Sequence, residues 1–567
     1  MIDFPLEPGR RRTRIVPIGD LSIGGELPPL LQSMITAPAA RPERALAEIR
    51  ALDQAGCRLI RLSLPTRKEL DAIPKLRQMM AAEGIKRPLV ADVHFSPQLA
   101  IDACECFEKV RINPGNFSDS PKNSRPAPDD PHWFEAGHLE LQAALEPLAQ
   151  AALQYHRAIR VGVNQGSLSE RLMGRYGDSP EGMVRSALET CDLLESFGLR
   201  DLVVSLKSSN PLTVQKAYRL LVAMRAPKEL LPLHLGVTEA GDGLMGRIKS
   251  LAGIGPLLFD GLGDTVRVSL TEPSEQEIHF GRDLLASLKP SEVVEQALQS
   301  WSRDLMSTRV GNGRAWVGDL SFGAHEPLAL VAFEGDQLAP VEPSWEPDFR
   351  LLEKDQGWFG PAGEPVLRVS SRSELDKARL EQNWLLLQAS EPVRLLRRFY
   401  AEQGPLKQPL GYLVQPEDFK GLAPMTELAC LLGEGLVDFV VVGQGLEASR
   451  LEALTYLLQA TRSRIFMTDY IACPSCSRTL FDLEATTAKI RARTKHLKGL
   501  KLGVMGCIVN GPGEMADADF GYVGSGPGKV DLYRGQERVR RNIDESEAVD
   551  ALIELIKASG RWQEPTS

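Results

Sequence analysis

The amino-acid sequence predicts an α/β protein with an N-terminal (β/α)8 TIM barrel, an inserted smaller α/β domain and a C-terminal α+β domain. Three observations support this prediction. Short apolar runs alternate with helical patterns from about residue 29 to 270, the composition changes between about 290 and 465, and three cysteines lie in the last hundred residues. The expected domains are residues 1–290, 291–465 and 466–567.

Length and composition limit the class of protein. The 567 residues are too many for one hydrophobic core, and the net charge of −9 argues against nucleic-acid binding through a basic surface. No apolar run approaches the roughly 20 residues that cross a bilayer, and the first residues show no targeting signal. Eight cysteines, mostly in apolar settings, suit a reducing compartment. We therefore expect a cytoplasmic protein with no membrane or nucleic-acid partner.

Eight apolar runs, each followed by a helical pattern, are the expected strands of the barrel. They are residues 29–34, 59–64, 88–95, 109–116, 158–167, 201–209, 231–241 and 265–270. Segments 183–197 and 211–224 between them have the spacing of amphipathic helices. A doubly wound open sheet would show the same alternation, but no Gly-x-Gly-x-x-Gly turn follows the first strand, which argues against a dinucleotide-binding fold.

Five cations lie near the ends of these strands, where the catalytic groups of a TIM barrel are expected. They are Arg61, Arg111, Arg160, Lys207 and Arg267. One arginine between Val and Ile is usually a solvated edge residue. Five in one barrel would bury like charges without partners unless an anionic ligand binds among them. The cations therefore predict a substrate with one or two phosphate groups.

Other strand ends supply polar and acid–base side chains. They are Asp92, His94, Asn113, Asn116, Asn164, Ser167, His234, Thr238, Glu239 and Ser269. Two of them have simpler interpretations, because Asp92 can pair with a neighbouring arginine and His234 can be an ordinary core residue. Glu239 lies beside a glycine-rich turn and is the better candidate for a general acid.

The segment from about 290 to 465 holds five of the seven tryptophans and is rich in Gly and Pro to about residue 365. Strand patterns at 384–388, 410–414 and 438–442 then alternate with helical patterns. Because the segment has no cluster of ionisable residues, we expect its role to be architectural.

The last hundred residues carry the motif that most sharply indicates chemistry. Cys473 and Cys476 form a Cys-Pro-Ser-Cys pair, and Cys507 begins a glycine-rich run that ends at Glu514. Three thiolates can hold three corners of a cubic iron–sulfur cluster, which usually takes four cysteines. No fourth cysteine is near, so Glu514 is the nearest candidate for the fourth ligand. A carboxylate is easily displaced, which would let substrate reach the iron.

Two other interpretations of these cysteines stay open. A structural zinc site needs a fourth Cys or His, and His496 is the only histidine near them in sequence. The Cys-Pro-Ser-Cys pair alone is also typical of a dithiol redox centre. That interpretation leaves Cys507 and the glycines after it unexplained.

Together the motifs resemble those of the 4-hydroxy-3-methylbut-2-en-1-yl diphosphate synthase family, iron–sulfur enzymes of the methylerythritol phosphate route to isoprenoids (terpenoids). The matching runs are residues 32–34, 91–95, 110–116, 161–164, 234–241, 473–476 and 507–514. The family's C-terminal fold is similar to a domain of sulfite and nitrite reductases. The segment at 290–465 resembles the middle domain of the three-domain form, which is similar to a second, degenerate barrel.

The resemblance implies an oxidoreductase that opens the ring of 2-C-methyl-D-erythritol 2,4-cyclodiphosphate by reductive dehydration, with ferredoxin or flavodoxin as electron donor. It implies a [4Fe-4S] cluster held by Cys473, Cys476, Cys507 and Glu514. The five strand-end cations, with Asp92, His94, Asn164 and Ser269, are the expected substrate-binding residues. We expect Glu239 to donate a proton and Glu514 to yield its place on iron. In the short, two-domain form each cluster closes over the partner's barrel, and here the inserted segment leaves open whether the chain acts as a homodimer.

Two rival functions remain. One is a barrel that binds a phosphorylated or pterin substrate, carries only structural zinc, and acts as a transferase or lyase. The other is an electron carrier or redox sensor, which has no use for five cations at strand ends.

Overall fold

The computed structural model of the chain describes residues 10–94, 96–117, 131–288, 315–317, 320–322, 328–333, 347–354, 357–359, 364–380, 383–404, 406–443, 446–473, 479–508, 515 and 518–565. None of the helices in these ranges is both long and apolar enough to cross a membrane. The chain divides into two compact units: residues 11–250, 262–285 and 468–567 in one, and residues 1–10, 251–261 and 286–467 in the other. The boundaries expected at residues 290 and 465 stay predictions.

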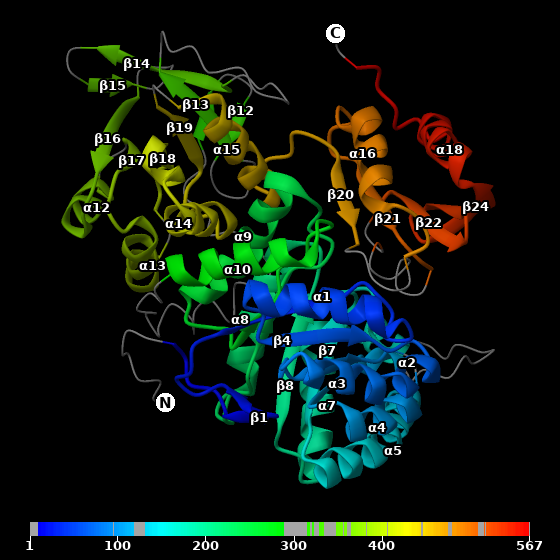
Figure 1. The fold of residues 1–567 in the computed structure, drawn as a ribbon. Coiled ribbons are helices and arrows are strands. Elements are labelled where there is room, and N and C mark those ends of the chain that lie inside the picture. Colours follow the sequence, from blue (N-terminus) through cyan, green and yellow to red (C-terminus); the bar gives the residue numbers. More distant parts are fainter. Residues whose placement is uncertain are drawn as a thin grey trace. The chain divides into compact units, whose positions relative to one another are not determined.

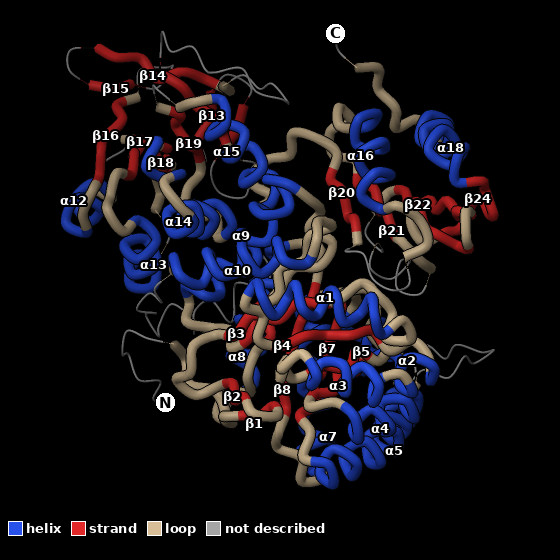
Figure 2. The backbone as a smooth tube through the Cα atoms, viewed as in Figure 1, coloured by secondary structure: helices blue, strands red, loops and turns tan. Residues whose placement is uncertain are grey.

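Eight parallel strands form the expected TIM barrel (Figure 1 and Figure 2). They are β3 (Leu30–Met34), β4 (Leu59–Ser63), β5 (Leu89–Asp92), β6 (Lys109–Ile112), β7 (Ala158–Asn164), β8 (Leu202–Lys207), β9 (His234–Leu235) and β10 (Thr265–Val266). Neighbours pair in sequence from β3 to β8, and β10 pairs with both β3 and β9. A bridge between Val204 and Leu233 closes the ring. The predicted fold class is confirmed, and each strand lies within its predicted run.

A hairpin that the sequence did not reveal packs at the amino-terminal end of the barrel. Its strands are β1 (Val16–Ile18) and β2 (Leu21–Ile23), which pair antiparallel. Val16, Ile18 and Ile23 are buried in one cluster with residues on four barrel strands, Leu59, Val90, Ala158 and Val203. Strands of three residues are too short to show the alternation by which strands are recognised.

Helices follow the barrel strands. The longer ones are α1 (Pro42–Ala55), α3 (Ile73–Ala82), α4 (Pro97–Cys106), α5 (Pro131–Tyr155), α7 (Pro180–Ser196), α8 (Pro211–Arg225), α9 (Gly243–Phe259) and α10 (Ser274–Ser287). Several begin with proline, which has the right φ and no N–H to leave unpaired. A hydroxyl before the proline caps the helix: Ser96 Oγ accepts from the Leu99 N–H, and Ser179 Oγ from the Gly182 N–H.

The other unit contains a smaller closed barrel. Its strands are β13 (Ala329–Phe333), β14 (Phe349–Lys354), β15 (Gly357–Phe359), β16 (Pro365–Val369), β17 (Trp384–Leu387), β18 (Leu410–Val414) and β19 (Phe439–Val442). The longer helices of this segment are α13 (Pro392–Gln403), α14 (Leu422–Gly433) and α15 (Ala448–Ala460). Trp384 packs against Phe439 in the core, with ring centroids 6.0 Å apart. The strands expected after residue 384 are present, whereas β13 to β15 occupy a stretch whose sequence is irregular.

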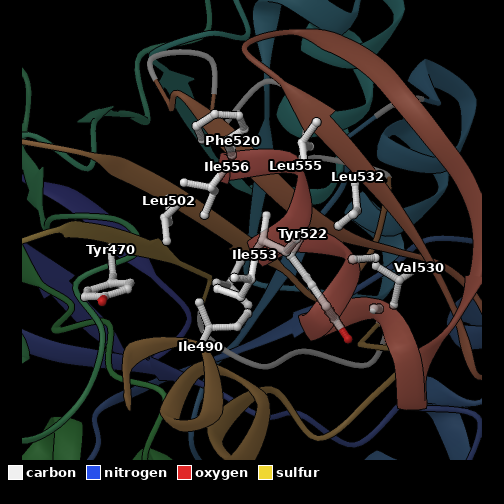
Figure 3. Close-up of a cluster of buried hydrophobic side chains, with 14 of the residues drawn as sticks. Tyr470, Ile490, Leu502, Phe520, Tyr522, Val530, Leu532, Ile553, Leu555 and Ile556 are labelled. Carbon is white, nitrogen blue, oxygen red and sulfur yellow. The ribbon is translucent and has the colours of Figure 1, made fainter. Parts of the chain in front are cut away.

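Among its described residues, the C-terminal region forms a five-stranded mixed sheet that packs against helices α16 and α18. The strands, in order across the sheet, are β20 (Asp469–Ala472), β21 (Lys501–Met505), β22 (Phe520–Gly526), β23 (Lys529–Arg534) and β24 (Glu537–Asp544). Side chains of α16 (Leu483–Thr494) and α18 (Glu545–Ala558) share one apolar core with the sheet, in which Leu502 and Tyr522 lie near Ile490 and Ile556 (Figure 3). Alternate residues, including Ile471 and Met505, belong to a second cluster on the opposite face.

Candidate active site and metal centre

The five predicted cations lie in the TIM barrel, from the middle of its strands to just beyond their carboxyl ends. Arg61 lies on β4, Arg111 on β6, Arg160 on β7, Lys207 ends β8, and Arg267 follows β10. All except Arg61 are buried, and Arg160 is only 1% exposed. The last residues of the strands form one surface in this fold, so the cations lie together as the sequence predicted.

Asp92 balances part of this charge. Its Oδ1 accepts from Arg111 Nη1 at 3.1 Å, and its Oδ2 lies 4.0 Å from Arg61 Nε and 3.3 Å from His94 Nε2. Burial acts to raise the pKa of Asp92, but the charges of Arg61, His94 and Arg111 outweigh burial and hold the pKa well below its usual value. Asp92 is therefore a carboxylate that orients the cations.

The remaining positive charge is not balanced by hydrogen-bond partners among the described residues. Arg160 Nε and Nη1 and Arg111 Nε are buried and lack such partners there. Burial, followed by repulsion from Arg61 and Arg111, lowers the pKa of Arg160, and burial with repulsion from the other cations lowers the pKa of Lys207. A bound anion would relieve both effects, because it supplies acceptors and opposite charge.

Two charged residues of this site were not predicted. Glu277, on α10, is 2% exposed and accepts from Arg267 Nε and Nη2 at 3.3 Å and from Ser33 Oγ at 2.6 Å. Lys109, at the start of β6, is fully buried and donates to Gln32 Oε1 at 3.1 Å. A glutamate in the first turn of a helix and a lysine at a strand start look like solvated residues, so the sequence carries no signal for either.

The polar strand-end residues divide into those at the cations and those with structural partners. Asn164 Oδ1 accepts from Arg111 Nη2 at 3.3 Å, and Ser269 is buried two residues after Arg267. Asn113 has a structural partner instead, because its Oδ1 accepts a hydrogen bond from the Gly115 N–H in a local turn. His234 is fully buried with Nδ1 2.8 Å from Thr265 Oγ1, and burial lowers its pKa well below the usual value. Burial thus favours the neutral form of His234, whose Nε2 has no hydrogen-bond partner among the described residues.

Glu239 lies in a loop that contacts the C-terminal sheet. It is 2% exposed, and its φ of 51° is rare for a residue other than glycine. Lys249 Nζ donates to the Glu239 carbonyl at 3.3 Å and to the Tyr470 carbonyl at 3.4 Å. A bridge pairs Ala240 with Ala472, the residue before Cys473. The loop of the expected proton donor therefore lies beside the strand that leads to the first cysteine of the motif.

Two of the expected metal ligands lie at neighbouring strand ends. Cys473 follows β20 and Cys507 follows β21 by two residues, and β20 and β21 are parallel neighbours. The Gly506 N–H donates to Cys473 Sγ at 3.2 Å, which places Cys507 next to that contact. Both thiols are half-buried. Cys476 and Glu514 lie outside the described residues.

The two described thiols are of the kind that hold an iron–sulfur cluster, but the described residues contain no group of three or more His, Cys, Asp or Glu side chains that could bind a metal. Iron–sulfur clusters are held by cysteine thiolates, and backbone N–H groups that point at sulfur tune their potential. His496, the histidine that a zinc site would need, bonds the Gln563 carbonyl at 2.8 Å and packs edge-on against Trp562. Cys57 and Cys104 differ from Cys473 and Cys507 because they are fully buried. Burial raises the pKa of both thiols to about 12, so they are unreactive core residues, as their apolar surroundings in the sequence indicate.

Fold and site together define a TIM-barrel protein with a group of buried cations in its barrel and a separate sheet with cysteines at its strand ends. The chain matches the model of the GcpE TIM-barrel domain over residues 13–282 and that of the GcpE protein C-terminal domain over residues 469–558. The chain therefore belongs to the GcpE family.

Three relatives span nearly the whole chain. Each is named 4-hydroxy-3-methylbut-2-en-1-yl diphosphate synthase (flavodoxin). The protein of Leptospira interrogans is 36% identical, with 98% of both chains covered. The protein of Chlorobaculum tepidum is 37% identical, covering 100% of this chain and 92% of its own. The protein of Porphyromonas gingivalis is 38% identical, with 98% of both covered. The family resemblance drawn from the motifs is confirmed.

Proposed function

We propose that this chain is a 4-hydroxy-3-methylbut-2-en-1-yl diphosphate synthase that takes electrons from flavodoxin. The observation that carries the proposal is the group of buried, incompletely paired cations at the strand ends, in a chain as long as relatives of that name. The reaction opens 2-C-methyl-D-erythritol 2,4-cyclodiphosphate. The C2–O bond to phosphate breaks, the C3 hydroxyl leaves as water, and a C2–C3 double bond forms as two electrons and one proton enter.

The cations bind the cyclic diphosphate and fix its ring. Asp92 forms an ion pair with Arg111, and Glu277 forms one with Arg267. These pairs orient the two guanidinium groups before substrate binds. Arg160 has buried donors without partners among the described residues, and Lys207 is surrounded by like charges, so phosphate oxygens would satisfy the first and offset the second. Arg61, His94, Asn164 and Ser269 complete the proposed substrate-binding residues.

The proposed cluster ligands are Cys473, Cys476, Cys507 and Glu514. When bound, a [4Fe-4S] cluster delivers electrons one at a time, which no side chain of this chain can do. Glu514, a carboxylate among thiolates, would be the most easily displaced of these four ligands.

Glu239 supplies the proton that converts the departing hydroxyl into water. Its carboxyl group is buried, and its left-handed backbone is a conformation that tertiary contacts must maintain. Lys249 provides one such contact at the Glu239 carbonyl. A cytoplasmic location, homodimer formation, and flavodoxin rather than ferredoxin as donor remain parts of this proposal.

Metal analysis with a low-temperature spectrum tests the proposal directly. Protein purified without oxygen should contain iron and sulfide in equal amounts, and Glu514→Ala should change the spectrum of the reduced cluster. Binding of the cyclodiphosphate, followed by calorimetry, should be lost in Arg111→Ala. Zinc without iron or sulfide would instead support a transferase or lyase, and a cluster with no cyclodiphosphate binding would support an electron carrier.

A further inference from the structure

The barrel loop that contains Glu239 pairs with the edge of the C-terminal sheet. β20 is the first strand in the order of that sheet, with β21 as its neighbour. Ala240, the residue after Glu239, forms a parallel bridge with Ala472 at the end of β20. An edge strand has backbone groups that its own sheet does not pair, so the barrel supplies a partner for β20 at this point. Cys473 is the next residue of the chain.

Two side chains of α9 add to this contact. Met245, near the start of α9, packs against the apolar core that the sheet shares with α16 and α18. Lys249, one turn further along α9, is 6% exposed and donates to the carbonyls of Glu239 and Tyr470 at 3.3 and 3.4 Å. One buried lysine therefore joins the backbone of the Glu239 loop to the backbone of β20.

An ion pair joins the same loop to helix α16. Arg491 Nη2 donates to Asp242 Oδ1 at 2.6 Å, and the two side chains are 25% and 26% exposed. The Arg491 guanidinium also lies over the Tyr470 ring, 5.4 Å from its centroid. Arg491 therefore contacts both the loop and β20 from the side of the C-terminal sheet, as Lys249 does from the side of the barrel.

The backbone on both sides of Asp242 is fixed to the barrel. The Gly241 carbonyl accepts from the Thr271 N–H at 3.1 Å, and the Gly243 N–H donates to Glu272 Oε1 at 2.8 Å. Asp242 lies between these two glycines, so its carboxylate projects from an anchored backbone. A change in the pair with Arg491 therefore alters how the whole loop meets β20.

We infer that Asp242 and Arg491 are a positioning pair that holds the Glu239 loop against β20. The inference rests on the proposed function, in which Glu239 donates the proton and Cys473 helps to hold the group that supplies electrons. Proton and electrons must reach the same bound substrate. A reacting group that is misplaced by about 1 Å can cost about a hundredfold in rate. The pair thus keeps the loop of the proton donor in a fixed place beside the strand that leads to Cys473.

Hydrogen exchange of the loop measures this positioning directly. Arg491→Met keeps most of the aliphatic stem and removes the charge. A partly exposed ion pair shifts a local equilibrium by about fivefold, so the amides of residues 239–246 should exchange about fivefold faster in this variant, as followed by mass spectrometry. The value of kcat should fall by about fivefold or more. KM, iron content and melting temperature should stay close to the wild type, because a single pair of this exposure adds little to global stability.

Arg493→Met is the matched control. Arg493 lies two residues further along α16 and pairs with Asp550 of α18, so this ion pair stays within the C-terminal region. Loop exchange and kcat in Arg493→Met should equal those of the wild type. Asp242→Asn removes the positioning pair from the barrel side and carries the test if Arg491→Met folds poorly. The reversed pair, Asp242→Arg with Arg491→Asp, should restore slow exchange and most of kcat.

The outcomes separate the inference from the function on which it rests. Either effect without the other in Arg491→Met and Asp242→Asn, or neither effect, would overturn the role of the pair. Equal effects in Arg493→Met, or a reversed pair that restores nothing, would overturn it too. A wild-type protein that converts no cyclodiphosphate, with reduced flavodoxin or with a chemical reductant, would instead overturn the proposed function.

Discussion

Replacing Arg160 by methionine should stabilise the ligand-free protein while weakening substrate binding. Arg160 is 1% exposed, and its Nε and Nη1 have no partners among the described residues. A buried donor left unpaired costs about 1–3 kcal/mol. Methionine keeps most of the aliphatic stem and removes both donors and the charge. We expect the free energy of unfolding to rise by about 2 kcal/mol, which is about 4 °C in the melting temperature of a region this large.

The stability advantage of Arg160→Met over the wild type should shrink once substrate is present. At a substrate concentration of about 100 times Kd, the wild type gains about 2.7 kcal/mol by mass action. Loss of a charge-assisted hydrogen bond of about 1.5–3 kcal/mol weakens binding about tenfold to a hundredfold or more, so Arg160→Met gains much less. Thermal unfolding with and without the cyclodiphosphate, in protein of equal iron content, measures both effects.

Arg225→Met is the control for Arg160→Met. Arg225 is 4% exposed but is fully engaged, with Nη1 3.0 Å from Asp192 Oδ1 and Nη2 2.7 Å from Glu195 Oε1. Removing one partner of a buried pair costs about 3–5 kcal/mol, so this variant should be destabilised. If Arg160→Met were destabilised like Arg225→Met, the idea that an anion accounts for the buried cations would be wrong.

Three further predictions concern Glu277, Lys249 and Lys207. Glu277→Gln should lower the free energy of unfolding by about 3 kcal/mol in denaturant titrations, because the Arg267 charge loses its buried partner. Lys249→Met should lower kcat about tenfold with little change in KM, because the bond from Lys249 to the Glu239 carbonyl holds the backbone of the proposed proton donor. Burial and like charges lower the pKa of Lys207. As pH rises through that lowered pKa, free Lys207 loses its proton, so substrate affinity should fall by up to about tenfold per pH unit and binding should take up a proton.

Simple outcomes would contradict each of these. Glu275→Gln, two residues earlier on α10, is the control for Glu277, and equal stability of the two variants would show that the buried pair contributes nothing. A KM effect as large as the kcat effect in Lys249→Met would place Lys249 at the substrate. For Lys207, the binding enthalpy would be measured by calorimetry over a range of pH in buffers of different ionisation enthalpy. An enthalpy that does not depend on the buffer would show that binding takes up no proton.

The alternation of short apolar runs with helical patterns was enough to predict the barrel strands and their order. Strands buried on both sides read as continuous apolar runs, and the polar residue that ends each run marks the functional end of the barrel. The hairpin of β1 and β2, and the strands β13 to β15, were missed because they are short or lie in irregular sequence. Their formation depends on partners distant in the chain, such as Ala158 and Val203 for the hairpin.

The sequence allowed prediction of only those site residues that are unusual for their local sequence. Arginines inside apolar runs and three cysteines in a glycine-rich setting are improbable as ordinary structure, so their identity pointed to a phosphate and a metal. Glu277 and Lys109 are ordinary in their local sequence. Only the closed barrel places Glu277 against Arg267 and Lys109 in the interior beside Gln32.

The sequence by itself determined which chemical groups are available: cations for phosphate, thiols for iron, and a carboxyl group for a proton. The tertiary structure decided which cations are balanced, since Asp92 and Glu277 hold Arg111 and Arg267 while donors of Arg160 stay unpaired among the described residues. The tertiary structure also decided where glycine is required. A Cβ at Gly503, on β21, would collide with Met515, which comes from a later segment of the chain. The physical reason is that charge balance and close packing depend on contacts between residues far apart in the chain, which local sequence does not encode.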